Sequence, residues 1–171
     1  MKKLSKSLLI LFSLCATLAC SNNDNAIYIS TSGEGSLVVN SDSADYLYRM
    51  VLLASENEQN IYLMGYTAYV DTDAEFEGRG AVIKITIPTT EQLTSIEAQS
   101  FTVGISDYTV SYSSYINYSS QSNDDLTALE SGTVIIRNSG LLYDIRILGE
   151  DSDENNIIAA YRGYIYRTLL N

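Results

Sequence analysis

Residues 141–149 read Leu-Leu-Tyr-Asp-Ile-Arg-Ile-Leu-Gly, and this stretch decides the fold class. Apolar side chains stand at positions 141, 143, 145 and 147, and charged side chains stand at 144 and 146. Successive side chains of a strand point to opposite faces of a sheet. The alternation therefore predicts an antiparallel strand with one face on a core and the other face in water.

The same pattern recurs on both sides of this stretch. Positions 81, 83, 85 and 87 are apolar around Lys84 and Thr86, and positions 157, 159, 161 and 165 are apolar around Arg162. Short apolar, β-branched and Tyr-rich runs alternate with Gly, Ser, Asn and Asp clusters. Nine strands are predicted, at residues 36–40, 46–55, 60–70, 80–87, 100–104, 108–118, 132–137, 141–149 and 156–168.

The connections between the expected strands are typical of hairpins. Asn138-Ser139-Gly140 supplies a glycine for a tight turn, and residues 56–59 and 150–155 form longer acidic loops. Only residues 89–99, opened by Thr89 with Gln92 three positions later, have the pattern of a helical turn.

An all-β fold follows, and we expect an antiparallel β-sandwich of about nine strands over residues 31–171. The stretch 46–55 is apolar on both faces, as a strand between two layers would be. A small β-barrel is the alternative, because strand spacing alone does not separate the two architectures.

The N-terminus has the pattern of an export signal. Lys2, Lys3 and Lys6 precede an apolar run from Leu8 to Leu18, which is too short to span a bilayer. The run ends in Thr17-Leu18-Ala19-Cys20, which resembles the lipobox of bacterial lipoproteins. We expect a signal peptide at 1–19, lipidation of Cys20, and a polar tether through residue 30.

Other parts of the chain resemble small lipoproteins of Bacteroidetes-type bacteria. Ser131-Gly132-Thr133-Val134, Tyr143-Asp144-Ile145 and Tyr161-Arg162-Gly163 are similar to their last three strands, and Ser21-Asn22-Asn23-Asp24-Asn25 weakly resembles their surface-export signal. The resemblance implies an extracytoplasmic β-sandwich with no established activity. It also implies an outer-membrane lipoprotein, displayed at the cell surface or otherwise held on the periplasmic face.

Net charge and cysteine content limit the kinds of partner and the kinds of site that the chain can have. The net charge is −11, and the mature chain would carry −14, because three of the ten basic residues but none of the 21 acids precede Cys20. Such a chain is expected to bind no nucleic acid and to contact the membrane through its lipid alone. Cys15 lies in the expected signal, so the mature domain would have no disulfide and no thiolate site.

The chain contains no His, which removes His-based catalytic triads and the usual zinc sites. Acid–base chemistry would have to rest on paired carboxylates, as in glycoside hydrolases. Among 21 acids some pair meets the required spacing by chance. We therefore expect a protein without enzymatic activity and without a cofactor, Ca²⁺ apart.

Calcium is the one metal that the acidic residues favour. Asp71, Asp73, Glu75 and Glu77 alternate along one extended segment, and hard oxygen ligands suit Ca²⁺. The alternative is a solvated acidic loop. Asp151-Ser152-Asp153-Glu154 is interpreted as a solvated hairpin turn.

Tyrosines supply the candidate ligand-binding residues, because their flat rings suit sugars and protein partners. Tyr164 and Tyr166 share a face with Arg162, and Tyr112 and Tyr115 lie in the Ser- and Tyr-rich run at 111–122. For the stripe that contains Tyr112, coverage of the core is the competing interpretation. These features favour a lipid-anchored binding module for a glycan or a partner protein, with a structural or accessory lipoprotein as the alternative.

Overall fold

The computed structural model describes residues 33–42, 44–65, 67–71, 73, 75–117 and 126–170, without the side chains of 115–117. Within these ranges the chain forms strands and no helix, so the all-β expectation is confirmed. No helix long and apolar enough to cross a membrane occurs there. The strands are β1 (Glu34–Val39), β2 (Asp45–Leu47), β3 (Arg49–Ala54), β4 (Glu58–Met64), β5 (Tyr69–Val70), β6 (Phe76–Glu77), β7 (Arg79–Pro88), β8 (Gln99–Val103), β9 (Thr109–Asn117), β10 (Thr127–Ser139), β11 (Leu142–Asp151) and β12 (Asn156–Leu170).

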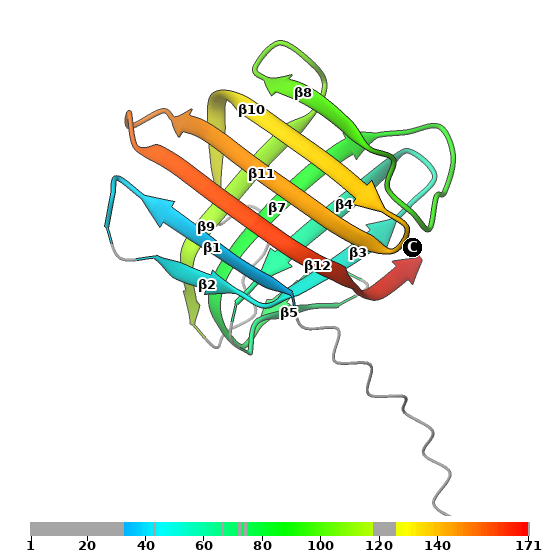
Figure 1. The fold of residues 1–171 in the computed structure, drawn as a ribbon. Coiled ribbons are helices and arrows are strands. Elements are labelled where there is room, and N and C mark those ends of the chain that lie inside the picture. The colour runs from blue at the N-terminus through cyan, green and yellow to red at the C-terminus, as the bar shows by residue number, and fades with distance from the viewer. Residues whose placement is uncertain are drawn as a thin grey trace, which may run out of the picture. The chain divides into compact units, whose positions relative to one another are not determined.

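Seven of these strands close into a barrel (Figure 1). The pairing runs from β12 through β11, β10, β9, β7, β4 and β3, and returns to β12. The β3–β12 pair is parallel, and the other six pairs are antiparallel. The architecture is therefore the barrel alternative with extra strands, and the pairing does not specifically support the expected sandwich.

The extra strands attach where β10 and β12 change neighbours. The start of β10 pairs with β9 and its later part pairs with β8, while β12 pairs first with β1 and then with β3. Gly163 lies at the change in β12, where an added Cβ would be 2.5 Å from the Cα of Gly33. Glycine is needed here because β12 passes the backbone of residue 33 too closely for any side chain.

The barrel interior is filled by the inward side chains of every major strand. The alternations predicted around Ile83, Ile145 and Ala159 are confirmed, since the apolar member of each alternation is buried. Leu141 is the exception. It is exposed because it lies with Gly140 in the two-residue turn that joins β10 to β11, and Gly140 has a φ of 64°.

A second apolar cluster lies outside the barrel and explains why residues 46–55 are apolar on both faces. Met50 and Leu52 of β3 point into the barrel, whereas Val51 and Leu53 point outward. Val51 and Leu53 share the outer cluster with Tyr62 of β4 and with Val70 and Phe76 of the β5–β6 hairpin, and Phe76 contacts Tyr62 directly. The predicted strand 46–55 is also divided at Tyr48, between β2 and β3.

The helical turn considered for residues 89–99 does not form. The hydroxyl of Thr89 accepts from the amide of Glu91, two residues on, and the Gln92 side chain donates to the Ala54 carbonyl. The buried Gln59 amide donates to the carbonyls of Leu93 and Ser95. Because long-range partners take these polar groups, the segment stays irregular instead of closing a helical hydrogen bond.

Candidate functional site

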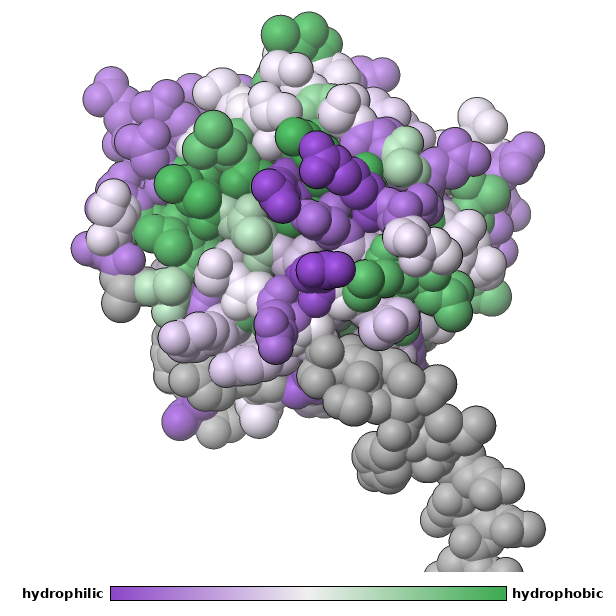
Figure 2. Space-filling model, in the orientation of Figure 1, coloured by the Kyte–Doolittle hydropathy of each residue, from purple (hydrophilic) through white to green (hydrophobic). Residues whose placement is uncertain are grey.

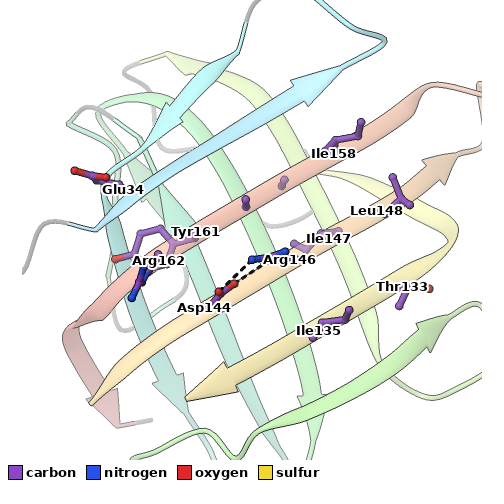
Figure 3. A pocket seen from close by; sticks show the side chains of 12 residues that line it. Glu34, Thr133, Ile135, Asp144, Arg146, Ile147, Leu148, Ile158, Tyr161 and Arg162 are labelled. Atoms are coloured by element: carbon purple, nitrogen blue, oxygen red, sulfur yellow. Dashed lines mark hydrogen bonds and ion pairs between the residues drawn. The ribbon is translucent and has the colours of Figure 1, made fainter. Parts of the chain in front are cut away.

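The outer surface of the β10–β11–β12 meander carries a shallow groove. The inward side chains of these strands fill the core, so the alternate side chains face solvent together with those of the neighbouring β1. The groove has a volume of about 710 Å³. Its lining (Figure 3) includes Glu34, Thr133, Ile135, Asp144, Arg146, Leu148, Ile158, Ala160, Tyr161 and Arg162.

Charged residues cross this surface in a row of alternating sign. Arg137 of β10 lies opposite Asp144 of β11, Asp144 lies opposite Arg162 of β12, and Arg162 lies opposite Glu34 of β1. Figure 2 shows the resulting hydrophilic band between two more apolar areas. We call Arg137, Asp144, Arg162 and Glu34 the charged row.

One member of the charged row has an ion-pair partner within its own strand. The Arg146 Nε lies 3.1 Å from the Asp144 Oδ1, and its Nη2 lies 3.4 Å from Oδ2 (dashed in Figure 3). The hydrogen bond that Arg146 donates to the Asp144 carboxylate raises the pKa of Arg146. This pair leaves the guanidinium groups of Arg137 and Arg162 without an ion pair or hydrogen bond among the residues that the structure describes.

The opposite end of the groove is apolar. Leu148 and Ile158 face each other across β11 and β12 and are 61% and 53% exposed. Figure 3 shows these two side chains next to each other, away from Arg162. The groove therefore offers both hydrogen-bonding groups and a small apolar contact surface.

Exposed tyrosines lie beyond the groove. Tyr164 follows Arg162 on the same face of β12, and the ring of Tyr166 lies under Arg49, with the guanidinium carbon 5.7 Å from the ring centroid. In and just after the edge strand β2, the exposed rings of Tyr46 and Tyr48 stack with centroids 6.2 Å apart. Tyr164 and Tyr166, the candidate ligand-binding tyrosines of β12, are both exposed.

Tyr112 does not belong to an exposed platform. Its ring is only 6% exposed and packs in the main core, and its hydroxyl donates to Asp151 Oδ2 at 2.8 Å. Burial raises the pKa of this hydroxyl, and the bond to Asp151 raises it further. Core coverage, the competing interpretation, is the correct one for Tyr112, while the side chain of Tyr115 lies outside the described residues.

Asp151 is not the solvated turn residue that was expected. Its carboxylate is buried and accepts from the backbone amides of Asp153 and Asn155 and from the Asn155 side chain, each at 2.9 Å. These bonds, led by that from the Asn155 side chain and joined by the Tyr112 hydroxyl, lower the pKa of Asp151 to about 2. The residue holds the β11–β12 turn and ties it to β9.

In the acidic run, Asp71, Asp73 and Glu75 lie between β5 and β6, and Glu77 belongs to β6. Asp71 Oδ1 accepts from the amides of Asp73 and Glu75 at 2.9 and 3.0 Å, and Glu77 accepts from the Tyr69 hydroxyl. Among the described residues no three acidic, His or Cys side chains are placed to hold a metal ion. Calcium binding by Asp71, Asp73, Glu75 and Glu77 stays a prediction.

Sequence reasoning identified Arg162 and missed Arg137, Arg146 and Glu34. Each of these lies on a strand, but the register that aligns them across four strands is set by pairing rather than by local sequence. A usable signal was present. Arg137, Arg146 and Arg162 are three of only seven basic residues after Cys20, and they fall on consecutive strands.

Comparison with known proteins provides no relative, because no protein-family model, no curated protein and no solved structure matches the chain. The expected signal peptide, the tether and Cys20 lie outside the described residues. The candidate site therefore rests on its own geometry.

Proposed function

We propose that the chain is an extracytoplasmic binding module, anchored to the outer membrane through a lipid on Cys20, and that it binds a glycan. The observation that carries the proposal is the open groove on the β10–β11–β12 surface, with the charged row across it and exposed tyrosines at its margin. The proposed location at the outer membrane rests on the lipobox-like Thr17-Leu18-Ala19-Cys20 and on the resemblance to Bacteroidetes-type lipoproteins.

A glycan suits this surface for two reasons. Sugar hydroxyls need many donors and acceptors, which the guanidinium of Arg162 and the carboxylate of Glu34 supply. The apolar faces of sugar rings pack on flat aromatic rings, which the stacked pair Tyr46 and Tyr48 and the nearby Tyr164 present to solvent.

The first test is binding of the protein to a panel of polysaccharides and host glycans. Tyr164→Ala/Tyr166→Ala is measured beside it, with Tyr69→Ala as the matched control, since Tyr69 is an exposed tyrosine on β5. We expect saturable binding that the double variant weakens by about tenfold or more and the control leaves unchanged. A blank panel, or equal loss in the control, would contradict a glycan site at this margin.

A partner protein is the second candidate, because Leu148 and Ile158 expose adjacent apolar side chains. Exposed apolar residues that cluster often mark protein contacts. An accessory lipoprotein of an outer-membrane complex would use such a contact. Crosslinking on intact cells, compared with Leu148→Ser/Ile158→Ser, distinguishes this candidate from glycan binding.

We propose binding without catalysis. Glu34 and Asp144 line the same groove, but Asp144 is held by Arg146, and Arg162 lies between the two carboxylates in the charged row. A glycosidase needs one carboxyl group to donate a proton and a second to act as base or nucleophile across the scissile bond. The bound glycan should therefore keep its chain length during incubation, and shortening of the chain would overturn this part of the proposal.

A further inference from the structure

The groove and a smaller hollow beside it are a local exception to the charge of the molecule. Arg137 lines that hollow together with Asp144 and Arg162, which also line the groove. Across the groove and the hollow, Arg137, Arg146 and Arg162 outnumber Glu34 and Asp144, although the whole chain carries −11. Arg146 is satisfied by Asp144, so Arg137 and Arg162 supply the available positive charge. Guanidinium groups form paired, charge-assisted hydrogen bonds with carboxylates and sulfates.

The spacing of these two arginines limits the ligand. They lie on β10 and β12 with Asp144 of β11 between them, so their backbones are two strand spacings, about 10 Å, apart. That separation is close to the length of one disaccharide. An extended acidic peptide repeats its side chains on one face every two residues, or about 7 Å, and matches the spacing less well.

From this placement we propose that the groove and the adjoining hollow recognise an acidic polysaccharide with a carboxylate or sulfate on alternate sugars, and that Arg137 and Arg162 each bind one acid group. The inference rests on the proposed glycan-binding function and specifies its ligand class. The chain lies across the strands, with the intervening sugar over Asp144 and the next sugars over Glu34, toward Tyr46 and Tyr48 at the β2 edge. Asp144 and Glu34 accept hydrogen bonds from hydroxyls of the intervening sugars.

The negative charge of the rest of the molecule should limit how much of an acidic polymer binds. Charges further than the Debye length of about 8 Å are largely screened at physiological salt, so the groove attracts the acid groups within it while the rest of the surface repels a long polyanion. Binding is therefore confined to a short segment, and it weakens when salt screens the two arginines.

The test uses the full chain, purified in detergent, and hyaluronan, whose carboxylates lie on alternate sugars. The ligand control is the same polymer with its carboxylates reduced to alcohols. The variants are Arg137→Gln and Arg162→Gln, and the matched control is Arg167→Gln, which removes the same charge from an exposed position of β12 outside the groove. We expect Arg137→Gln and Arg162→Gln each to weaken binding by about tenfold, the reduced polymer to bind poorly, and the control to bind like the wild type.

The outcomes separate this inference from the proposed function. Equal binding of the reduced polymer, lost in Tyr164→Ala/Tyr166→Ala, would overturn acid recognition and leave the glycan module standing. Equal loss in Arg167→Gln would overturn the placement of the site. Binding of poly-glutamate in preference to hyaluronan would overturn the ligand class, and no binding to either polymer form would overturn the inference.

Because Arg137 and Arg162 are exposed, unchanged melting curves are expected for all three variants.

Discussion

At the scale of single residues, the most informative side chain is one that sequence reasoning placed wrongly. Asp151 stands in an acidic run and has the sequence context of a solvent-exposed turn residue, yet it is buried with four hydrogen-bond donors around its carboxylate. Its partner Tyr112 is 39 residues away in the chain. No local pattern indicates such a pair, so Asp151 was assigned to a solvated turn, and core coverage was one of two interpretations left open for Tyr112.

The ionised form of Asp151 should stabilise the fold in a defined pH range. Its folded pKa of about 2 lies below the ordinary value of 3.8, so its contribution is complete above about pH 4 and is lost as the pH falls through about 2. Asp151→Asn should melt at a lower temperature than the wild type at pH 7, and the difference should narrow between pH 4 and pH 2.

Asp153→Asn is the control for this prediction, because Asp153 is exposed in the same turn and contributes only its backbone amide to Asp151. It should melt like the wild type at both pH values. A constant difference between Asp151→Asn and the wild type across the whole pH range would contradict the role assigned to the ionised carboxylate.

At the scale of elements, the positions of most strands were predictable and their neighbours were not. The period-two alternation indicated which side chains of β7, β11 and β12 are buried, because a strand with one buried face has apolar residues at alternate positions of its own sequence. The apolar character of residues 51 and 53 was also visible, but it was assigned to a sandwich. Its cause is the outer apolar cluster, which these two residues share with side chains of β4 and of the β5–β6 hairpin.

The β5–β6 hairpin should therefore act as a structural cover. Phe76 is fully buried, and its ring meets Tyr62 edge to face with centroids 5.6 Å apart. Phe76→Ala should cost about 3 kcal/mol in the free energy of unfolding, because it leaves a cavity beside Tyr62 in the outer apolar cluster. Chemical denaturation measures the loss, and Phe76→Leu, which keeps most of the apolar volume, should retain most of the stability. A change below about 1 kcal/mol for Phe76→Ala would show that the hairpin is dispensable.

At the scale of the whole molecule, the sequence gives the net charge and the residue content, but it does not show where the charges gather or which distant strands pair. A chain of −11 was expected to bind no nucleic acid, and its composition does not reveal that strand pairing gathers three arginines on one face. Likewise, closure of the barrel depends on the parallel β3–β12 pair, which joins segments more than 100 residues apart. Register between distant strands is a property of the folded sheet, and the alternation of each strand does not contain it.

The proposed membrane attachment is tested on the whole molecule. If the lipid on Cys20 is the only membrane contact, then Cys20→Ala should move the protein from the membrane fraction to the soluble fraction, since an acidic body has no attraction to anionic lipids. Fractionation and metabolic labelling with palmitate measure this change, and Cys15→Ala is the control. Retention of the Cys20→Ala protein in membranes would contradict the anchor.

The parallel pairing of β12 with β3 has a consequence for how fast the chain folds. The barrel stays open, with β3 presenting an unpaired edge, until β12 has found both β11 and β3. Bringing β12 to β3 closes the long chain segment between them, and this costs conformational entropy before the β3–β12 contacts can stabilise the fold. Folding should therefore take milliseconds to seconds rather than microseconds. During that interval the apolar strand β3 is open to pairing with other chains, and aggregation competes with closure.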